Sequence, residues 1–269
     1  MSVDVAVPGA ARFSIGRVFR DSFGVFGRNI VIFGIAAIAA RLVVLLTSPI
    51  VDLVPAGAPN WTPDLISTGL ELVASGLTEA AIVFATFQCL LGHRATIAHV
   101  AHGLRSAVPM VVAGMIYSIP FHFTDLIKLS LGEEGVLTAV VSLAAVVVAV
   151  VLTVMWWVYT PAIAIEGKSI FASFSRSAEL TRGRRWAILG LFILVSVVLI
   201  IPTVLVAFVT HWSLSEALAE GPTTVSGAAG YVFYALLDAF YTVLVAVAYY
   251  HLRVEKEGVG IEDIVRVVD

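Results

Sequence analysis

The sequence predicts an all-α fold, a polytopic membrane bundle of six transmembrane helices, and three observations support this prediction. Hydrophobic residues make up 59% of the 269 residues and charged residues only 13%, whereas soluble domains carry roughly 25% charged residues. Six apolar runs are long enough to cross the hydrocarbon core of a bilayer, which takes about 20 helical residues. Lys and Arg gather at alternate ends of these runs. We therefore expect one integral membrane domain over residues 1–269.

The six apolar runs define the predicted spans. The first run follows a basic stretch and is too long for the core of a signal peptide, so we interpret it as an uncleaved span. Pro120 and three charged or polar residues interrupt the third run. These three, His122, Asp125 and Lys128, share one helical face and either line an outer polar vestibule or reach to the interface. The spans are expected at about residues 30–54, 65–91, 109–131, 136–162, 186–208 and 228–252.

The basic residues predict the orientation of the bundle. All 16 Lys and Arg residues except Arg41 and Lys128 fall before the first span, after the last span, or in the second and fourth connections. The charged residues of the other connections are all acidic. Because basic segments stay on the cytoplasmic side, we expect an even number of spans with both termini in the cytoplasm. The expected location is the bacterial cytoplasmic (inner) membrane.

Three short segments, at residues 13–28, 95–107 and 169–181, combine one apolar stripe with a basic face. Helices of this kind lie in the plane of the membrane, and each segment precedes an outgoing span. Each outgoing span also contains a proline, which bends a helix; the bends either open a cavity or only improve packing. The prolines are Pro49, Pro120 and Pro202. The chain thus consists of three repeat units, at roughly residues 12–92, 93–166 and 167–253, and a cytoplasmic tail at 254–269.

The most distinctive local pattern begins at Pro161. It reads Pro-Ala-Ile-Ala-Ile-Glu-Gly-Lys-Ser, then Ser-Phe-Ser-Arg-Ser from Ser173 and Leu-Thr-Arg-Gly-Arg from Leu180. With Phe-Ser-Ile-Gly-Arg from Phe13, it resembles the membrane domain fused to some glycerophosphoryl diester phosphodiesterases, and related stand-alone bacterial membrane proteins of uncharacterised function. The resemblance implies a fold and little chemistry. The phosphodiesterase activity of the fused proteins belongs to a separate soluble barrel, for which this chain has no room.

The same residues have a direct physical interpretation. Gly167 permits a sharp turn at the membrane interface, and Ser169 is placed to cap the in-plane helix that follows. Four arginines would then face anionic lipid headgroups, each contributing about 1 kcal/mol of attraction; a role in topology and packing alone is the alternative. These arginines are Arg176, Arg182, Arg184 and Arg185.

Three charged residues lie deep within predicted spans, namely Arg41, Glu79 and Asp238. Arg41 and Glu79 lie at similar depth, roughly 17 Å from the cytoplasmic side at 1.5 Å per residue. An unpaired charge at that depth costs several kcal/mol. We therefore predict an Arg41–Glu79 ion pair, with Asp238 as the alternative partner. Such a pair either fixes helix packing or belongs to a substrate or proton path.

Other chemical signals are weak. Cys89 is the only cysteine, so no intrachain disulfide is possible. His99 and His102 stand three residues apart with His93 nearby, but without a cysteine or carboxylate we expect polar residues at headgroup level and no metal. Phosphate-binding and hydrolase motifs are absent from the sequence. The net charge of −3 offers no basic field for nucleic acid. We expect no cofactor and no enzymatic activity.

Three functions remain open from sequence. The leading expectation is a non-enzymatic bundle that binds membrane lipids, anionic ones included, or a membrane-protein partner. The second is a small transporter or channel that uses Arg41, Glu79 or Asp238, and it predicts a hydrated central cavity. The third, an enzyme of lipid metabolism within the membrane, has the least support because no nucleophile is nominated.

Overall fold

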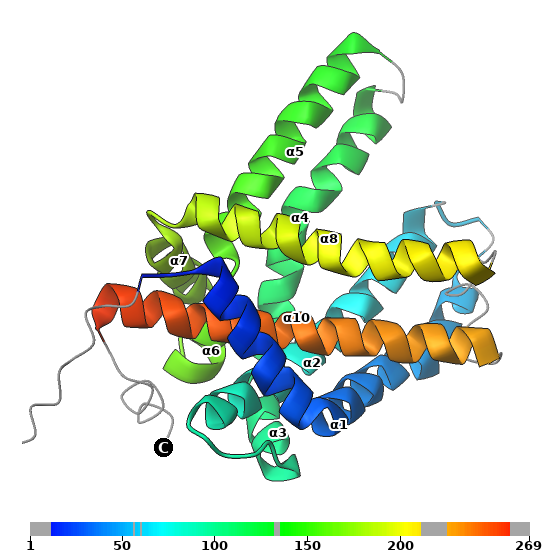
Figure 1. The fold of residues 1–269 in the computed structure, drawn as a ribbon. Coiled ribbons are helices and arrows are strands. Elements are labelled where there is room, and N and C mark those ends of the chain that lie inside the picture. Colours follow the sequence, from blue (N-terminus) through cyan, green and yellow to red (C-terminus); the bar gives the residue numbers. More distant parts are fainter. Residues whose placement is uncertain (1–11, 56, 60, 132–134, 211–224, 259–269) are drawn as a thin grey trace, which may run out of the picture.

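The computed structural model describes residues 12–55, 57–59, 61–131, 135–210 and 225–258, and within these ranges all regular elements are helical (Figure 1). The elements are α1 (Ile15–Thr47), the 3-10 helix η1 (Ser48–Leu53), α2 (Trp61–Leu90), α3 (Ile97–Gly103), the 3-10 helix η2 (Leu104–Ser106), α4 (Ala107–Leu131), α5 (Val136–Trp156), α6 (Tyr159–Glu166), α7 (Ile170–Thr181), α8 (Arg185–Thr210) and α10 (Val225–Glu257).

Five described helical segments are long and apolar enough to cross a membrane. The segment Arg185–Val198 of α8 is a shorter apolar helix. The all-α prediction is therefore confirmed for the described residues, whereas the number of six spans stays a prediction. The five segments are Ile15–Leu53, Trp61–Leu90, Ile97–Phe123, Val136–Glu166 and Gly230–Glu257.

Asn29 divides α1 into two parts that meet at a kink. Its backbone leaves the helical region, with φ −127° and ψ 16°. The side-chain Nδ2 donates to Val25 O at 2.8 Å, and Oδ1 accepts a bond from Ala95 N at 2.9 Å. One amide side chain thus bonds a backbone carbonyl of α1 and a backbone N–H of the segment just before α3. The kink falls at the boundary predicted between the first in-plane segment and the first span.

The predicted fourth span, at residues 136–162, is two helices and not one. α5 ends at Trp156, and Val158 between the helices has φ −106° and ψ 29°. The hydroxyl of Ser177 in α7 accepts a bond from Val158 N at 3.1 Å and donates to Met155 O at 2.9 Å. Because Ser177 replaces the lost helical bonds, the break costs less than an unsatisfied interruption would. Hydropathy does not register such a break.

Two of the predicted in-plane segments form short helices, α3 and α7. Ile97 and Phe171 on them are 78% and 76% exposed, as an apolar stripe facing the bilayer requires. Gly167 ends α6 in the left-handed conformation at φ 61°, which confirms the predicted turn. The predicted capping bond of Ser169 is wrong, since this residue occupies the N-cap of α7 without a side-chain bond. That the three units form a repeat stays a prediction.

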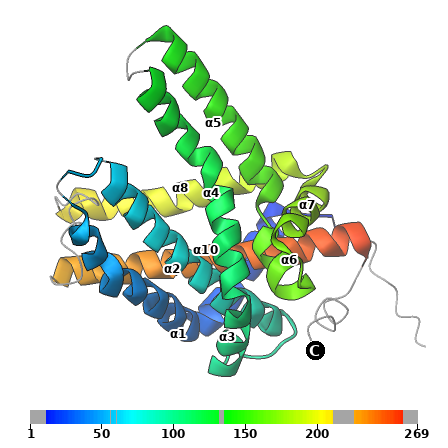
Figure 2. The same ribbon diagram turned by 180° about the vertical axis from the view of Figure 1, so that it is seen from behind.

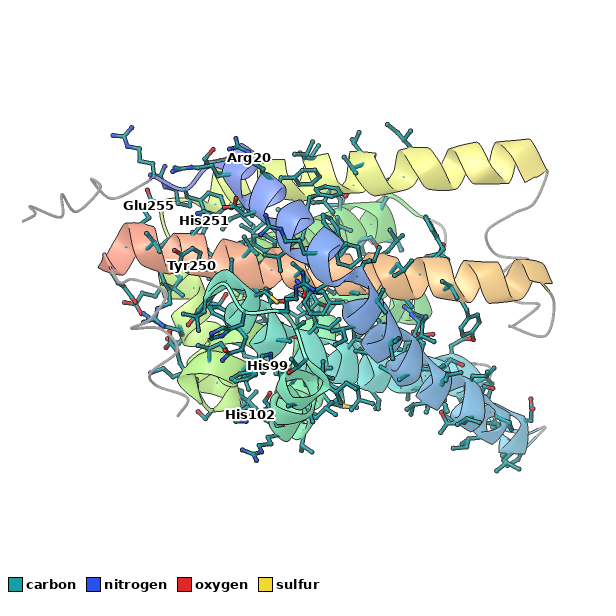
Figure 3. The ribbon with its side chains drawn as sticks, turned by 60° about the horizontal axis from the view of Figure 1, so that its bottom comes forward. Arg20, His99, His102, Tyr250, His251 and Glu255 are labelled. Carbon is teal, nitrogen blue, oxygen red and sulfur yellow. The ribbon has the colours of Figure 1, made fainter. Side chains whose placement is uncertain are left out.

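α10 forms the centre of the bundle. Every residue from Thr242 to Tyr249 is buried, and the helix packs on α1 and α2 (Figures 1 and 2). His251, labelled in Figure 3, lies on its last turns, and its Nε2 is 2.9 Å from Asp21 Oδ2 of α1. The α4–α5 hairpin points away from these helices, and Val136 and Val140 on it are 82% and 59% exposed. An exposed apolar surface of this length suits contact with lipid.

Candidate functional site

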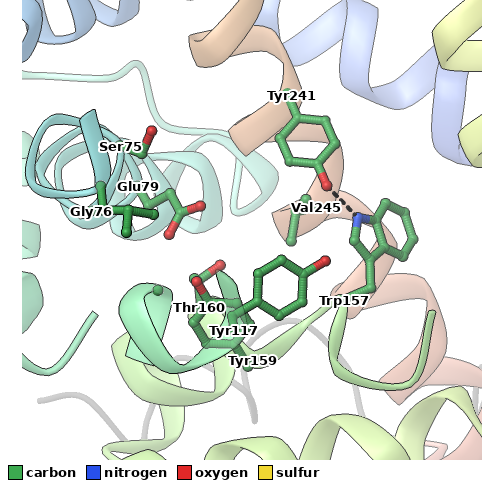
Figure 4. A pocket seen from close by; sticks show the side chains of 11 residues that line it. Ser75, Gly76, Glu79, Tyr117, Trp157, Tyr159, Thr160, Tyr241 and Val245 are labelled. Atoms are coloured by element: carbon green, nitrogen blue, oxygen red, sulfur yellow. Dashed lines mark hydrogen bonds between the residues drawn. The ribbon is translucent and has the colours of Figure 1, made fainter. Parts of the chain in front are cut away.

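A cavity of about 190 Å³ lies between α2, α4, α6 and α10 (Figure 4). Glu79 is the only charged residue among those that line it. Four aromatic side chains form part of the wall, and Ser75 and Thr160 add hydroxyl groups. The aromatic residues are Tyr117, Trp157, Tyr159 and Tyr241.

The carboxylate of Glu79 points into this cavity (Figure 4). Across the described part of the chain, Glu79 forms no hydrogen bond and no ion pair. Its electrostatic neighbour is Asp238, a second acidic group. A carboxylate inside an apolar bundle is costly unless a proton, a cation or water compensates its charge. The cavity therefore has a negative or proton-binding character.

Tyr241 and Trp157 are held together by a hydrogen bond on the wall opposite Glu79. Trp157 Nε1 donates to the Tyr241 hydroxyl at 3.0 Å (Figure 4). Since indole is only a donor, Tyr241 keeps its own hydroxyl hydrogen for another acceptor. Trp157 also packs on Phe192 of α8, with ring centroids 5.0 Å apart. The α5–α6 break places Trp157 and Tyr159 beside the cavity.

Two glycines bring neighbouring helices against α2 near Glu79. A Cβ on Gly76 would lie 2.5 Å from Val111 Cγ2 and 3.0 Å from Val111 Cα. A Cβ on Gly103 would lie 2.1 Å from the Ala80 carbonyl oxygen. Small residues allow this close backbone approach between membrane helices. α4 and α3 are thereby held close to α2 at residues next to Glu79 in the helix.

The predicted Arg41–Glu79 ion pair is wrong, because Arg41 pairs with another acid of α2. Its Nη1 lies 3.3 Å from Glu71 Oε2, with the two side chains 19% and 51% exposed. Glu71 and Glu79 are eight residues apart, which turns their side chains by about 80° around the helix axis. Depth alone does not say which side of α2 faces α1. Glu79 faces the cavity, and Glu71 takes the position beside Arg41.

Asp238, the alternative partner, lies near the same cluster. The charge of Arg41 and that of Glu71 both act on it. Among the described residues, Arg41 Nε and Asp238 Oδ2 are buried without a hydrogen-bond partner, and Arg41 and Asp238 form no ion pair with each other. Asp238 links the two polar groups electrostatically, since it also acts on Glu79.

Glu166, Arg176, Arg253 and Glu257 form a second polar site, the arginine–carboxylate network, where α6, α7 and α10 meet. Arg176 Nε lies 3.0 Å from both carboxylate oxygens of Glu166, whose side chain is 9% exposed. Arg253 lies 3.5 Å from Glu166 and donates to Glu257 at 2.7 Å. Arg176 also bonds Glu257, and Tyr249 donates to Glu166. Alternating charges thus close a ring that joins three helices.

This network changes the interpretation of the four arginines predicted to meet lipid headgroups. Burial opposes the charge of Arg176, but its bonds to Glu257 and Glu166 raise the pKa of the guanidinium above its ordinary value. A hydrogen bond to Glu255 likewise raises the pKa of Arg184. Arg182 is exposed, and Arg185 Nε is buried without a partner. Contact with lipid headgroups stays a prediction for all four.

Of the histidines predicted to lie at headgroup level, His99 and His102 belong to α3 and His93 precedes it. His102 stacks on Phe84 with ring centroids 4.3 Å apart, and His93 Nδ1 lies 3.1 Å from Gln88 Oε1. In the described residues no group of three or more His, Cys, Asp or Glu side chains could hold a metal ion. His122 on α4 is exposed. The side chains of Asp125 and Lys128, which belong to the predicted vestibule, lie outside the described residues.

The comparison with protein families gives one match. A family model for a domain of unknown function (DUF7847) matches residues 87–252. The chain belongs to this family. No curated protein and no solved structure matches this chain. Nothing in these comparisons supports the resemblance to glycerophosphoryl diester phosphodiesterases. The matched residues contain α4, α6 and α10, which form three walls of the cavity, while Glu79 lies just before them on α2.

Sequence reasoning found Glu79 but missed the residues around it. Tyr117, Tyr159 and Tyr241 were absent from the predicted site, because aromatic residues at helical spacing usually belong to the core. A polar stripe on α2 was available as a signal, since Glu71, Ser75 and Glu79 follow at intervals of four. Such a stripe indicates one polar side of a transmembrane helix, but it does not identify the helices that face it.

Proposed function

We propose that this chain is a small multi-pass transporter of the bacterial cytoplasmic membrane that binds its solute in the Glu79 cavity. The proposal includes six spans, cytoplasmic termini, three repeat units and no enzymatic activity. One observation carries it: the half-buried carboxylate of Glu79, which has no ion-pair partner among the described residues, faces a cavity inside a bundle of apolar helices. A bundle that served only as a scaffold would have no use for this group, because an acid among apolar helices lowers stability.

The α5–α6 break supports the same function. Transporters form their solute sites at interrupted helices, because freed backbone groups and the side chains beside the break can face a cavity. Here Trp157 and Tyr159 flank the break and line the cavity. Ser177 satisfies the backbone on the other side. The interruption is thus stabilised away from the cavity and leaves the cavity side available to a solute.

Water access to the cavity tests this proposal. Cys89 is first replaced by Ser, and Ser75→Cys is then introduced in the cavity wall. In liposomes, a water-soluble thiol reagent should label Ser75→Cys readily. Val140→Cys on the exposed apolar side of α5 is the matched control, and it should stay unlabelled because lipid excludes water and thiolate. Equal, slow labelling of both variants would show a sealed cavity and overturn the proposal.

The lipid-binding alternative retains one specific observation. Arg182 is exposed and Arg185 Nε lacks a partner, whereas Arg176 and Arg184 already contact carboxylates. If this alternative holds, Arg182→Gln with Arg185→Gln should lower the amount of anionic lipid that copurifies. Native mass spectrometry measures that amount. An unchanged lipid content would exclude this role for the two arginines.

A further inference from the structure

We infer that the Glu79 cavity takes a small organic cation, an ammonium group carried on an apolar body. This inference rests on the proposed function and specifies the substrate class of the same cavity. Four properties of the cavity support it: its charge, its aromatic wall, its hydroxyl groups and its volume.

Charge comes first. Among the residues that line the cavity, Glu79 is the one carboxylic acid and none is Lys, Arg or His. The charged residue that acts on it electrostatically, Asp238, is acidic. Arg41, the cation that acts on Asp238, forms its ion pair with Glu71. A cationic ligand would therefore supply the charge that the described protein groups do not supply to Glu79.

The aromatic wall favours an organic over an inorganic cation. Aromatic rings present negative faces, and cages of Trp and Tyr recognise ammonium groups. Tyr117 and Tyr159 lie 5.3 Å apart between ring centroids, and Trp157 and Tyr241 stand beside them (Figure 4). A metal cation such as Ca²⁺ takes about six to eight oxygen ligands. Those ligands are mainly carboxylates, carbonyls and water, whereas the lining of this cavity offers one carboxylate and otherwise hydroxyl groups.

The hydroxyl groups and the volume define the rest of the ligand. Oxygen atoms of Thr160 and the tyrosines can accept bonds from ammonium hydrogens, alongside Glu79. A cavity of about 150 Å³ lined by apolar residues holds benzene, and this one measures about 190 Å³. The site therefore fits a ligand of about eight non-hydrogen atoms, with one charged end at Glu79.

Two probes of equal shape separate charge from size, namely benzylammonium and benzyl alcohol. Their binding to the purified full chain in nanodiscs is measured by calorimetry. We expect benzylammonium to bind at least about tenfold more tightly than the alcohol, because only the cation gains from the carboxylate. Equal affinities for the two probes, or no binding of benzylammonium, would overturn the inference.

Variants locate the binding. Glu79→Gln should weaken benzylammonium at least about tenfold and leave benzyl alcohol nearly unchanged. Asp64→Asn removes an exposed charge of the same helix outside the cavity and serves as the control, with unchanged binding. Should Glu79→Gln fail to fold, Trp157→Leu removes an aromatic face without changing charge. It should weaken benzylammonium about threefold or more, and undiminished binding would contradict the inference.

The labelling experiment keeps the two proposals distinguishable. If Ser75→Cys is labelled and benzylammonium does not bind, the cavity is open to water and only the cation assignment fails. If Ser75→Cys stays unlabelled, the transporter proposal fails, and the cation assignment fails with it.

Discussion

The docking of α3 on α2 depends on Gly103, where a side chain would meet the backbone of the neighbouring helix. A Cβ at this position would lie 2.1 Å from the Ala80 carbonyl oxygen and 3.3 Å from Phe84 Cβ. Neither contact is the movable end of a long side chain. Gly103→Ala therefore forces α3 away from α2 at Ala80, the residue that follows Glu79.

The magnitude follows from two opposing effects. Overpacking in a tightly packed site costs about 1–3 kcal/mol, and here the obstacle is a backbone oxygen. Replacing Gly by Ala in a helix contributes at most about 1 kcal/mol of stability. We expect a net loss of about 1–2 kcal/mol in the free energy of unfolding.

The assay is unfolding of the purified protein in mixed micelles by increasing amounts of SDS, followed by circular dichroism. Gly24→Ala is the matched control, because a Cβ on Gly24 meets no atom within 4 Å. It should leave stability equal or slightly higher. If Gly103→Ala is as stable as Gly24→Ala, the close contact between α3 and α2 is wrong.

Three further perturbations test other contacts, each by the same unfolding measurement. Glu166→Gln should lower stability by on the order of 3 kcal/mol, since it leaves two partly buried arginines short of a carboxylate. Glu179→Gln, at a 71% exposed side chain, should change stability by less than about 0.5 kcal/mol, and similar effects of the two would count against the network. Asn29→Ala should lower the free energy of unfolding by about 1–2 kcal/mol, because two bonds from its side chain to backbone groups at the kink are lost. Ser67→Ala, at an exposed position of α2, should be near neutral. Arg41→Leu should destabilise the protein more than Glu71→Leu, because both break the Arg41–Glu71 pair but only the first removes the cation that acts on Asp238; the reverse order would contradict the interaction of Arg41 with Asp238.

The contrast between Arg41 and Glu79 explains how far sequence reasoning reached at the candidate site. Counting residues from the helix ends placed both residues at similar depth in the membrane. Their position within apolar segments indicated that an unpaired charge there would cost free energy. The partner depends on the rotation of α2 and on the direction of a long arginine side chain. The side chains of Glu71 and Glu79 differ by about 80° around the helix axis, and this rotation places Glu71 beside Arg41. Two charges at equal depth are therefore insufficient to predict a pair.

The arginine–carboxylate network illustrates the same point for the basic segment after α6. The sequence predicts Arg176 and Arg184 at the membrane interface, where basic residues gather. Their carboxylate partners Glu257 and Glu255 lie more than 70 residues away in the chain. No local pattern connects residues so far apart. Only the approach of α7 and of the turn after it to the end of α10 brings them together.

By itself the sequence determined the helical class, the apolar segments and the turn at Gly167, because these follow from local hydropathy and backbone freedom. The tertiary structure decided the break between α5 and α6, the partner of Arg41 and the aromatic residues around Glu79. These features depend on which faces of distant helices meet. Hydrophobicity specifies that a helix is buried in an apolar environment, but side-chain fit and hydrogen bonds decide its rotation and its neighbours.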